Sequence, residues 1–155
     1  MAKFKRLILT ELGNTTDIYN WTEKKPGKNY VFRSRSNEYV VKPAQIKDNE
    51  ISVDYMFKDD SGGLSMDQTG EGNPFRVVAT VVDIVEYVWK NRHDFYRNPE
   101  GIEKIHFTGA PKKGETFGDT ARKKLYLQFV KSKFPNAKVD VDSLGGVDVY
   151  PPESI

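Results

Sequence analysis

The valine-rich stretch Phe75–Trp89 constrains the fold more than any other part of the sequence. Valine favours strands, but a strand of this length would be unusual. Placed at intervals of about 100°, its apolar side chains form one stripe, which predicts an amphipathic helix despite the weak helix propensity of valine. Asn73-Pro74, directly before the stretch, is a typical helix start. The stripe consists of Val77, Val78, Val81, Val82, Ile84, Val85, Val88 and Trp89.

The first third of the chain has the patterns of antiparallel strands. Apolar and polar residues alternate cleanly in Ile51–Phe57, which predicts a half-buried strand. Tyr30–Arg35 and Glu38–Lys42, separated by two residues, predict a hairpin. Phe4–Thr10 predicts a first strand. Between that strand and the hairpin, Asn14–Gly27 is a polar connection that ends in a Pro-Gly turn signal.

The last third predicts a strand, a helix and a terminal hairpin. Ile102–Thr108 is the strand, and the helix ends at about Phe134, before a Pro-Asn pair. Valines alternate on both sides of Gly145-Gly146, which predicts the hairpin. If Ile102–Thr108 and Val139–Val141 pair in parallel, their crossover should be right-handed.

This order of elements predicts an α+β fold, with two helices packed on one face of a mainly antiparallel sheet. A length of 155 residues fits a single domain. Within it we expect a meander over residues 1–57, a first helix over 74–92 and a strand–helix–hairpin unit over 102–150.

The composition argues against several classes of site. The chain has no cysteine, which excludes disulfides and thiolate zinc sites. Neither His93 nor His106 lies near a nucleophile motif, and Gly70-Glu71-Gly72 is neither a P-loop nor a dinucleotide fingerprint. We therefore expect no cofactor, no metal and no catalytic residue. No apolar run approaches the roughly 18–20 residues of a membrane span, so we expect a cytoplasmic protein.

Charge is strongly segregated along the chain. Residues 1–47 carry ten basic and four acidic groups, whereas residues 48–72 carry one basic and seven acidic groups. Such blocks either face each other within the fold or form surface patches of opposite sign. Patches of this kind would suit docking to a charged partner.

The second predicted helix carries an arginine in an unexpected place. On a helical wheel Arg122 falls inside the apolar arc, near Tyr126. A guanidinium facing inward needs a partner, which is either an internal acid or carbonyl or the anion of a ligand. Lys112 and Lys113 come just before this helix, where basic side chains and a helix N-terminus can hold a phosphate. These residues form a candidate anion site.

A second candidate site would bind nucleic acid. Basic and aromatic residues alternate around the predicted hairpin, and aromatic rings on a sheet face can stack on bases. The same aromatic residues could equally be core residues, with the arginines facing solvent. The candidates are Lys28, Tyr30, Arg33 and Arg35, together with Lys123 and Lys124 of the second helix.

Three blocks of the sequence together resemble a family of small uncharacterised proteins encoded by tailed bacteriophages. They are Val53–Phe57, Gly70–Val81, and the segment from Ile105-His106-Phe107 through Ala121–Tyr126. The similarity covers about half the chain. It implies a phage origin and an α+β fold with no established activity. It marks Thr80, Arg122 and Tyr126 without assigning them a mechanism.

These observations favour a non-enzymatic interaction protein, phage-encoded, that acts as a minor virion component or binds a host factor. Its location would be the host cytoplasm or the virion. One alternative is an accessory protein that binds nucleic acid. Another is a nucleotide- or anion-binding protein that uses Arg122, Lys112 and Lys113, with Tyr126 and Thr80 nearby.

Overall fold

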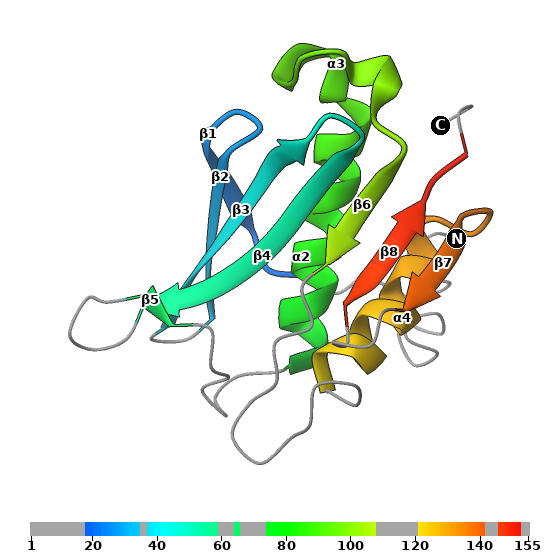
Figure 1. Cartoon of the computed structure of the whole chain (residues 1–155). Helices are drawn as coiled ribbons and strands as arrows, with labels where there is room; N and C mark the ends of the chain where they lie inside the picture. Colours follow the sequence, from blue (N-terminus) through cyan, green and yellow to red (C-terminus); the bar gives the residue numbers. More distant parts are fainter. Residues whose placement is uncertain are drawn as a thin grey trace, which may run out of the picture.

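The computed structural model describes residues 18–34, 37–58, 64–65, 74–107, 121–141 and 146–152. The described strands form one sheet, and helices α2 and α4 lie on the same face of it (Figure 1). This arrangement confirms the predicted α+β class. The elements are β1 (Trp21–Lys25), β2 (Asn29–Ser34), β3 (Asn37–Lys47), β4 (Glu50–Lys58), β5 (Leu64–Ser65), α2 (Pro74–Lys90), α3 (Arg92–Phe95), a 3₁₀ turn (Pro99–Gly101), β6 (Lys104–Phe107), α4 (Ala121–Lys133), β7 (Lys138–Val141) and β8 (Val147–Tyr150).

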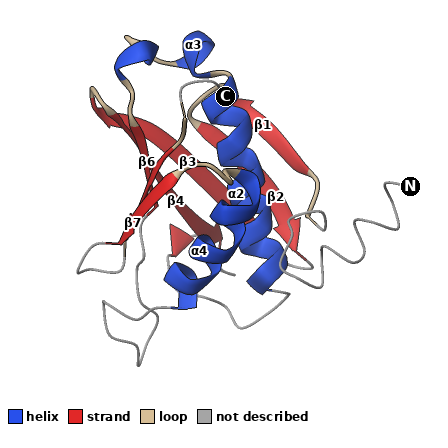
Figure 2. Ribbon diagram, turned by 90° about the vertical axis from the view of Figure 1, so that its right-hand side faces the viewer, coloured by secondary structure: helices blue, strands red, loops and turns tan. Residues whose placement is uncertain are grey.

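The strands follow one another in the order β1-β2-β3-β4-β6-β8-β7, and the short β5 pairs with β4. All neighbours on this path are antiparallel except β4 and β6, which are parallel. The sheet curves so that β1 and β2 lie alongside α2 (Figure 2). One sheet face is therefore packed on helices, and the other faces the viewer in Figure 1.

The predicted hairpin and the strand after it are confirmed. Arg33 of β2 pairs with Glu38 of β3, and β3 continues to Lys47. Pro43 lies within this strand, beyond the last β2–β3 pair, Tyr30 with Val41. A proline lacks the N–H that a second neighbouring strand would need, so this position tolerates it.

The segment Asn14–Gly27 is not simply a polar connection, because its second half forms β1. Trp21 faces the core, where its indole N–H donates to the Asp83 carboxylate at 3.0 Å. The prediction failed because Glu23 also faces inward and lowers the apparent hydrophobicity of the strand. The predicted strand Phe4–Thr10 lies outside the described residues.

The terminal hairpin is confirmed, with Val139 paired to Val149 and Val141 paired to Val147. The conditional parallel pairing of the preceding strand with β7 does not occur, because β8 lies between β6 and β7. The parallel partner of β6 is instead β4, where Ile51 pairs with Ile105. Helix α2 lies on the long connection between these two strands.

The core lies between the sheet and the two helices. The predicted apolar stripe of α2 is buried along its whole length. Helix α4 contributes Tyr126, whose ring lies 4.6 Å from that of Phe107 in β6. Burying a valine or larger apolar side chain stabilises the fold by about 1.5–3 kcal/mol each, so α2 supplies much of the stability. Phe129 and Val130 of α4 and Phe134, directly after the helix, are also buried.

Candidate binding site

The turn between β1 and β2 is held against α3. Gly27 has a φ of 73°, which favours glycine, and a Cβ there would lie 2.6 Å from the Cβ of Phe95. The Tyr96 hydroxyl donates to the Gly27 carbonyl at 2.6 Å. The N–H of Lys28 donates to the Lys25 carbonyl at 2.9 Å and closes the turn. The two lysines are therefore presented on a fixed loop.

The Glu23 carboxylate of β1 faces the inner side of the hairpin. Glu23 accepts hydrogen bonds from the hydroxyls of Tyr30, at 2.8 Å, and Tyr87, at 3.0 Å. Burial raises the pKa of both tyrosines, and the hydrogen bonds to Glu23 raise it further. Both hydroxyls therefore stay protonated and continue to donate.

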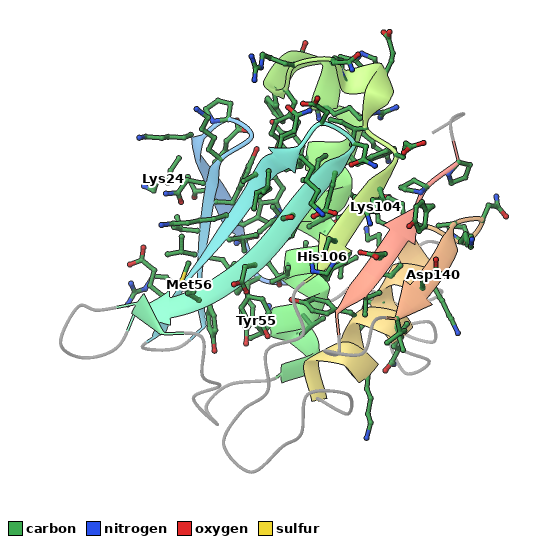
Figure 3. All side chains as sticks on the ribbon, viewed as in Figure 1. Lys24, Tyr55, Met56, Lys104, His106 and Asp140 are labelled. Atoms are coloured by element: carbon green, nitrogen blue, oxygen red, sulfur yellow. The ribbon has the colours of Figure 1, made fainter. Side chains whose placement is uncertain are left out.

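Exposed cations concentrate on β1, β2 and their turn. Lys24, Lys25, Lys28 and Arg33 are all exposed, and we call this surface the basic hairpin. Figure 3 shows Lys24 at the outer edge of β1. Arg33 lies 3.5 Å from the Glu38 carboxylate. Within the described part of the chain, the three lysines form no salt bridge, so their charges are available to a partner.

A groove of about 540 Å³ opens beside the basic hairpin. Its walls come from three strands, from the residues before β1 and from the start of α2. Three of its lining side chains are cationic and one is acidic. The lining residues are Ile18, Tyr19, Asn20, Thr22, Lys24, Val31, Phe32, Arg33, Glu38 and Arg76.

A stack of three side chains forms one wall of the groove. The Tyr19 ring stacks on Phe32, with ring centres 5.8 Å apart, and the Arg76 guanidinium lies 4.1 Å from the centre of the Tyr19 ring. Arg76 also donates to the Ile18 carbonyl at 3.2 Å. The Tyr19 N–H donates to the Thr80 hydroxyl at 2.9 Å, and that hydroxyl donates to the Arg76 carbonyl at 2.7 Å. These hydrogen bonds fix the backbone of Ile18 and Tyr19 to α2.

The helix-free face carries a separate polar network across β4, β6 and β8. The Ser52 hydroxyl donates to Glu50 at 2.6 Å, and Lys104 lies 3.5 Å from both Glu50 and Asp148. His106 Nδ1 lies 2.7 Å from Asp148. Figure 3 labels Lys104 and His106 on β6. Burial lowers the pKa of Lys104, but Asp148 and neighbouring groups outweigh it and raise the pKa. Since its charges face one another, this network ties the strands together.

Several residues predicted from the sequence lie outside the described structure. Lys112, Lys113 and Arg35 belong to segments that are not described, and the side chains of Arg122 and Lys123 are not described either. The proposed grouping of Arg122 with the two loop lysines therefore stays a prediction.

The other predicted residues are placed. Thr80 and Tyr126 are fully buried, and the Thr80 hydroxyl is used within the fold. Tyr30 is also fully buried, so its ring offers no face to a base. The exposed members of the predicted sets are Lys28, Arg33 and Lys124.

The sequence analysis missed the groove residues Tyr19, Lys24 and Arg76. The first two belong to an alternation of inward Tyr19, Trp21 and Glu23 with outward polar residues, a period-two signal hidden by the glutamate. Arg76 sits beside Tyr19 only because α2 packs on the hairpin, and no local pattern indicates that.

Comparison of the chain with family models, curated proteins and solved structures finds no match. No helix in the described ranges has both the length and the apolar character needed to cross a membrane. Among the same residues, no three acidic or histidine side chains gather closely enough to hold a metal ion.

Proposed function

We propose that this chain is a non-enzymatic binding protein whose basic hairpin docks on an acidic surface of a protein partner. The observation that carries the proposal is the group of exposed lysines, Lys24, Lys25 and Lys28, which have no salt-bridge partner in the described structure. Complementary charge across an interface accelerates association and favours the correct partner.

A protein partner fits this surface better than nucleic acid. Binding of single strands relies on aromatic faces as well as on cations. The rings of the hairpin are occupied, since Tyr30 and Phe32 are buried and Trp21 packs edge-on against Tyr30 and Tyr87.

The sequence resemblance to tailed-phage proteins supports a phage origin. On that origin, the partner is another virion component or a host factor, and the protein acts in the virion or in the host cytoplasm. In both cases the partner must present an acidic surface to the basic hairpin.

Titration of isotope-labelled protein, followed by NMR, tests the proposal with two probes of equal charge. One is a peptide of alternating glutamate and valine, and the other is oligo(dT). We expect the peptide to shift the amide signals of Lys24, Lys25 and Lys28. Replacing these three lysines with glutamine should weaken peptide binding about tenfold.

The matched control replaces three other exposed lysines, Lys42, Lys47 and Lys131, with glutamine, and removes the same charge. Equal losses in the two triple variants would show only non-specific attraction and would contradict the proposal. Tighter binding of oligo(dT) at the same residues would replace the protein partner with nucleic acid.

A further inference from the structure

Strand β7 lies at one end of the sheet (Figure 1), and within the described part of the chain it pairs only with β8. The backbone N–H and C=O groups along its outer edge therefore have no strand partner among the described residues. This edge also carries Val141, whose exposed fraction is 45%. In the described ranges, Ile46 is the only other large apolar side chain that is exposed. An edge of this kind is a template for pairing with a strand of another chain.

Apolar and charged side chains lie on opposite faces of β7. Val139 and Val141 are paired with fully buried valines of β8, so they lie on the face that carries the helices. Lys138 and Asp140 lie on the other face, where their side chains are 74% and 52% exposed. A strand added to this edge would therefore meet an apolar row on one face and a pair of opposite charges on the other.

The charge of Asp140 is poorly balanced within the chain. Asp140, labelled in Figure 3, lies directly opposite Asp148 of β8, and like charges in such positions repel each other. Asp148 is 3.5 Å from the Lys104 ammonium and 2.7 Å from His106. In contrast, the ion-pair partner of Asp140 among the described residues is Lys138 of its own strand, at 3.9 Å. A cation placed beyond the edge would be attracted to Asp140.

A second copy of this chain supplies a cation at the matching position. If two copies pair antiparallel about a two-fold axis, with their helices on the same face, one residue of β7 must lie opposite itself. An axis beside Asp140 or Lys138 brings two like charges together. An axis beside Val139 instead places Lys138 of each copy opposite Asp140 of the other. The charge pattern of β7 therefore selects one register.

The same register covers the exposed apolar side chain. Val141 of each copy then lies opposite Ala137 of the other, which is partly buried against the core. The apolar face of β7 thus continues from one copy into the next. Strand β1, at the other end of the sheet, has no such complementarity, because its exposed charged side chains, Lys24 and Lys25, are both cationic.

We propose that two copies of the chain pair through β7, antiparallel and centred on Val139, to form a dimer with one continuous sheet. The inference does not depend on the proposed function, because the basic hairpin lies at the opposite end of the sheet. The dimer would carry a basic hairpin at each far end and could dock on two acidic sites at once. Because the contact is short, we expect a dissociation constant on the order of 10 µM.

Sedimentation equilibrium of charge-reversed variants tests the inference. Lys138→Asp and Asp140→Lys each place like charges opposite one another across the axis, and each should weaken the dimer at least about tenfold. An equimolar mixture of the two variants should dimerise within about threefold of the natural chain, because each variant then meets the opposite charge. The double variant Lys138→Asp/Asp140→Lys should dimerise as the natural chain does.

The controls reverse charge at the exposed turn between β3 and β4. Lys47→Asp and Asp48→Lys should leave the dimer unchanged. Equal weakening by these controls, or a mixture of the single variants that stays monomeric, would contradict pairing through β7. Circular dichroism checks that each variant folds. If one single variant does not, the loss of dimer in the other and its recovery in the double variant carry the test.

Two further outcomes overturn the inference. A natural chain that stays monomeric up to about 1 mM does not pair through β7. Species larger than a dimer would mean that β7 of one copy pairs with β1 of the next, because such a head-to-tail contact does not close. Binding of the glutamate–valine peptide to the basic hairpin is measured separately, so the docking function can stand or fail whichever result the sedimentation gives.

Discussion

The hydroxyl of Tyr96 donates a 2.6 Å hydrogen bond to the carbonyl oxygen of Gly27, 69 residues earlier in the chain. This bond joins the segment after α3 to the turn of the basic hairpin. The lysines on either side of the turn, Lys25 and Lys28, therefore owe their position to a contact distant in sequence.

Gly27→Ala should destabilise the protein by about 2–3 kcal/mol, because the backbone there has a positive φ and the new Cβ would meet Phe95. Urea unfolding measures the change. Lys28→Ala, one residue away and exposed, should stay within about 0.5 kcal/mol of the natural protein. A Gly27→Ala variant as stable as Lys28→Ala would show that the turn can relax.

Stability should fall in alkaline solution. Burial raises the pKa of Tyr30 and Tyr96 above the usual value of about 10. Because the folded protein holds these protons more tightly than the unfolded chain, the free energy of unfolding is at its full value below about pH 10 and decreases above it. Tyr96→Phe should make this decrease shallower in urea unfolding between about pH 8 and 11. An unchanged pH dependence would argue against the burial of this phenol.

Helices α2 and α4 should be coupled through Lys133. Its ammonium lies 3.0 Å from Asp83 and 3.2 Å from Glu86. Burial lowers the pKa of Lys133, but the hydrogen bond and charge of Asp83 together with those of Glu86 outweigh it and raise the pKa. A double-mutant cycle of Lys133→Met and Asp83→Asn should give a coupling energy of about 1 kcal/mol.

The control cycle uses Lys90 and Glu86, which are 3.5 Å apart within α2, where the lysine side chain is 54% exposed. Their coupling should be only about 0.3–0.5 kcal/mol. Equal couplings in the two cycles would mean that the contact between the helices adds nothing beyond a surface pair.

Thr80 should matter for the groove through its hydroxyl. Thr80→Val removes the acceptor of the Tyr19 N–H and should cost about 1–2 kcal/mol in stability. Thr80→Ser retains the hydroxyl and should preserve the stability. If the valine and serine variants are equally stable, this hydrogen bond does not help to hold Tyr19 against α2.

Local patterns in the sequence were sufficient to predict the elements whose side chains follow a single periodicity. Periodicity predicted α2 because its apolar stripe meets both the sheet and α4. Alternation predicted β4 because Ile51, Val53 and Tyr55 all face the core. β1 was not predicted, because its inward Glu23 accepts hydrogen bonds from Tyr30 and from Tyr87, and Tyr87 lies 64 residues away.

The candidate site was harder to predict from the sequence, because its contacts also join residues that are distant in the chain. Its wall joins Arg76 to Ile18 across 58 residues, and Tyr19 to Thr80 across 61. The parallel pairing of β4 with β6 is likewise a long-range outcome. In contrast, Lys28 and Arg33 were found, since an exposed cation next to a turn or on alternate strand positions is a local property.

The parallel pairing of β4 with β6 separates the chain into two parts that should fold at different rates. The strands before it pair with their immediate neighbours in sequence, so each closes a short loop. At the seam, Glu50 must meet Lys104 across a much longer loop, with greater loss of chain entropy. The meander, including the basic hairpin, should therefore form its contacts early. Joining the C-terminal strands should set the overall folding rate.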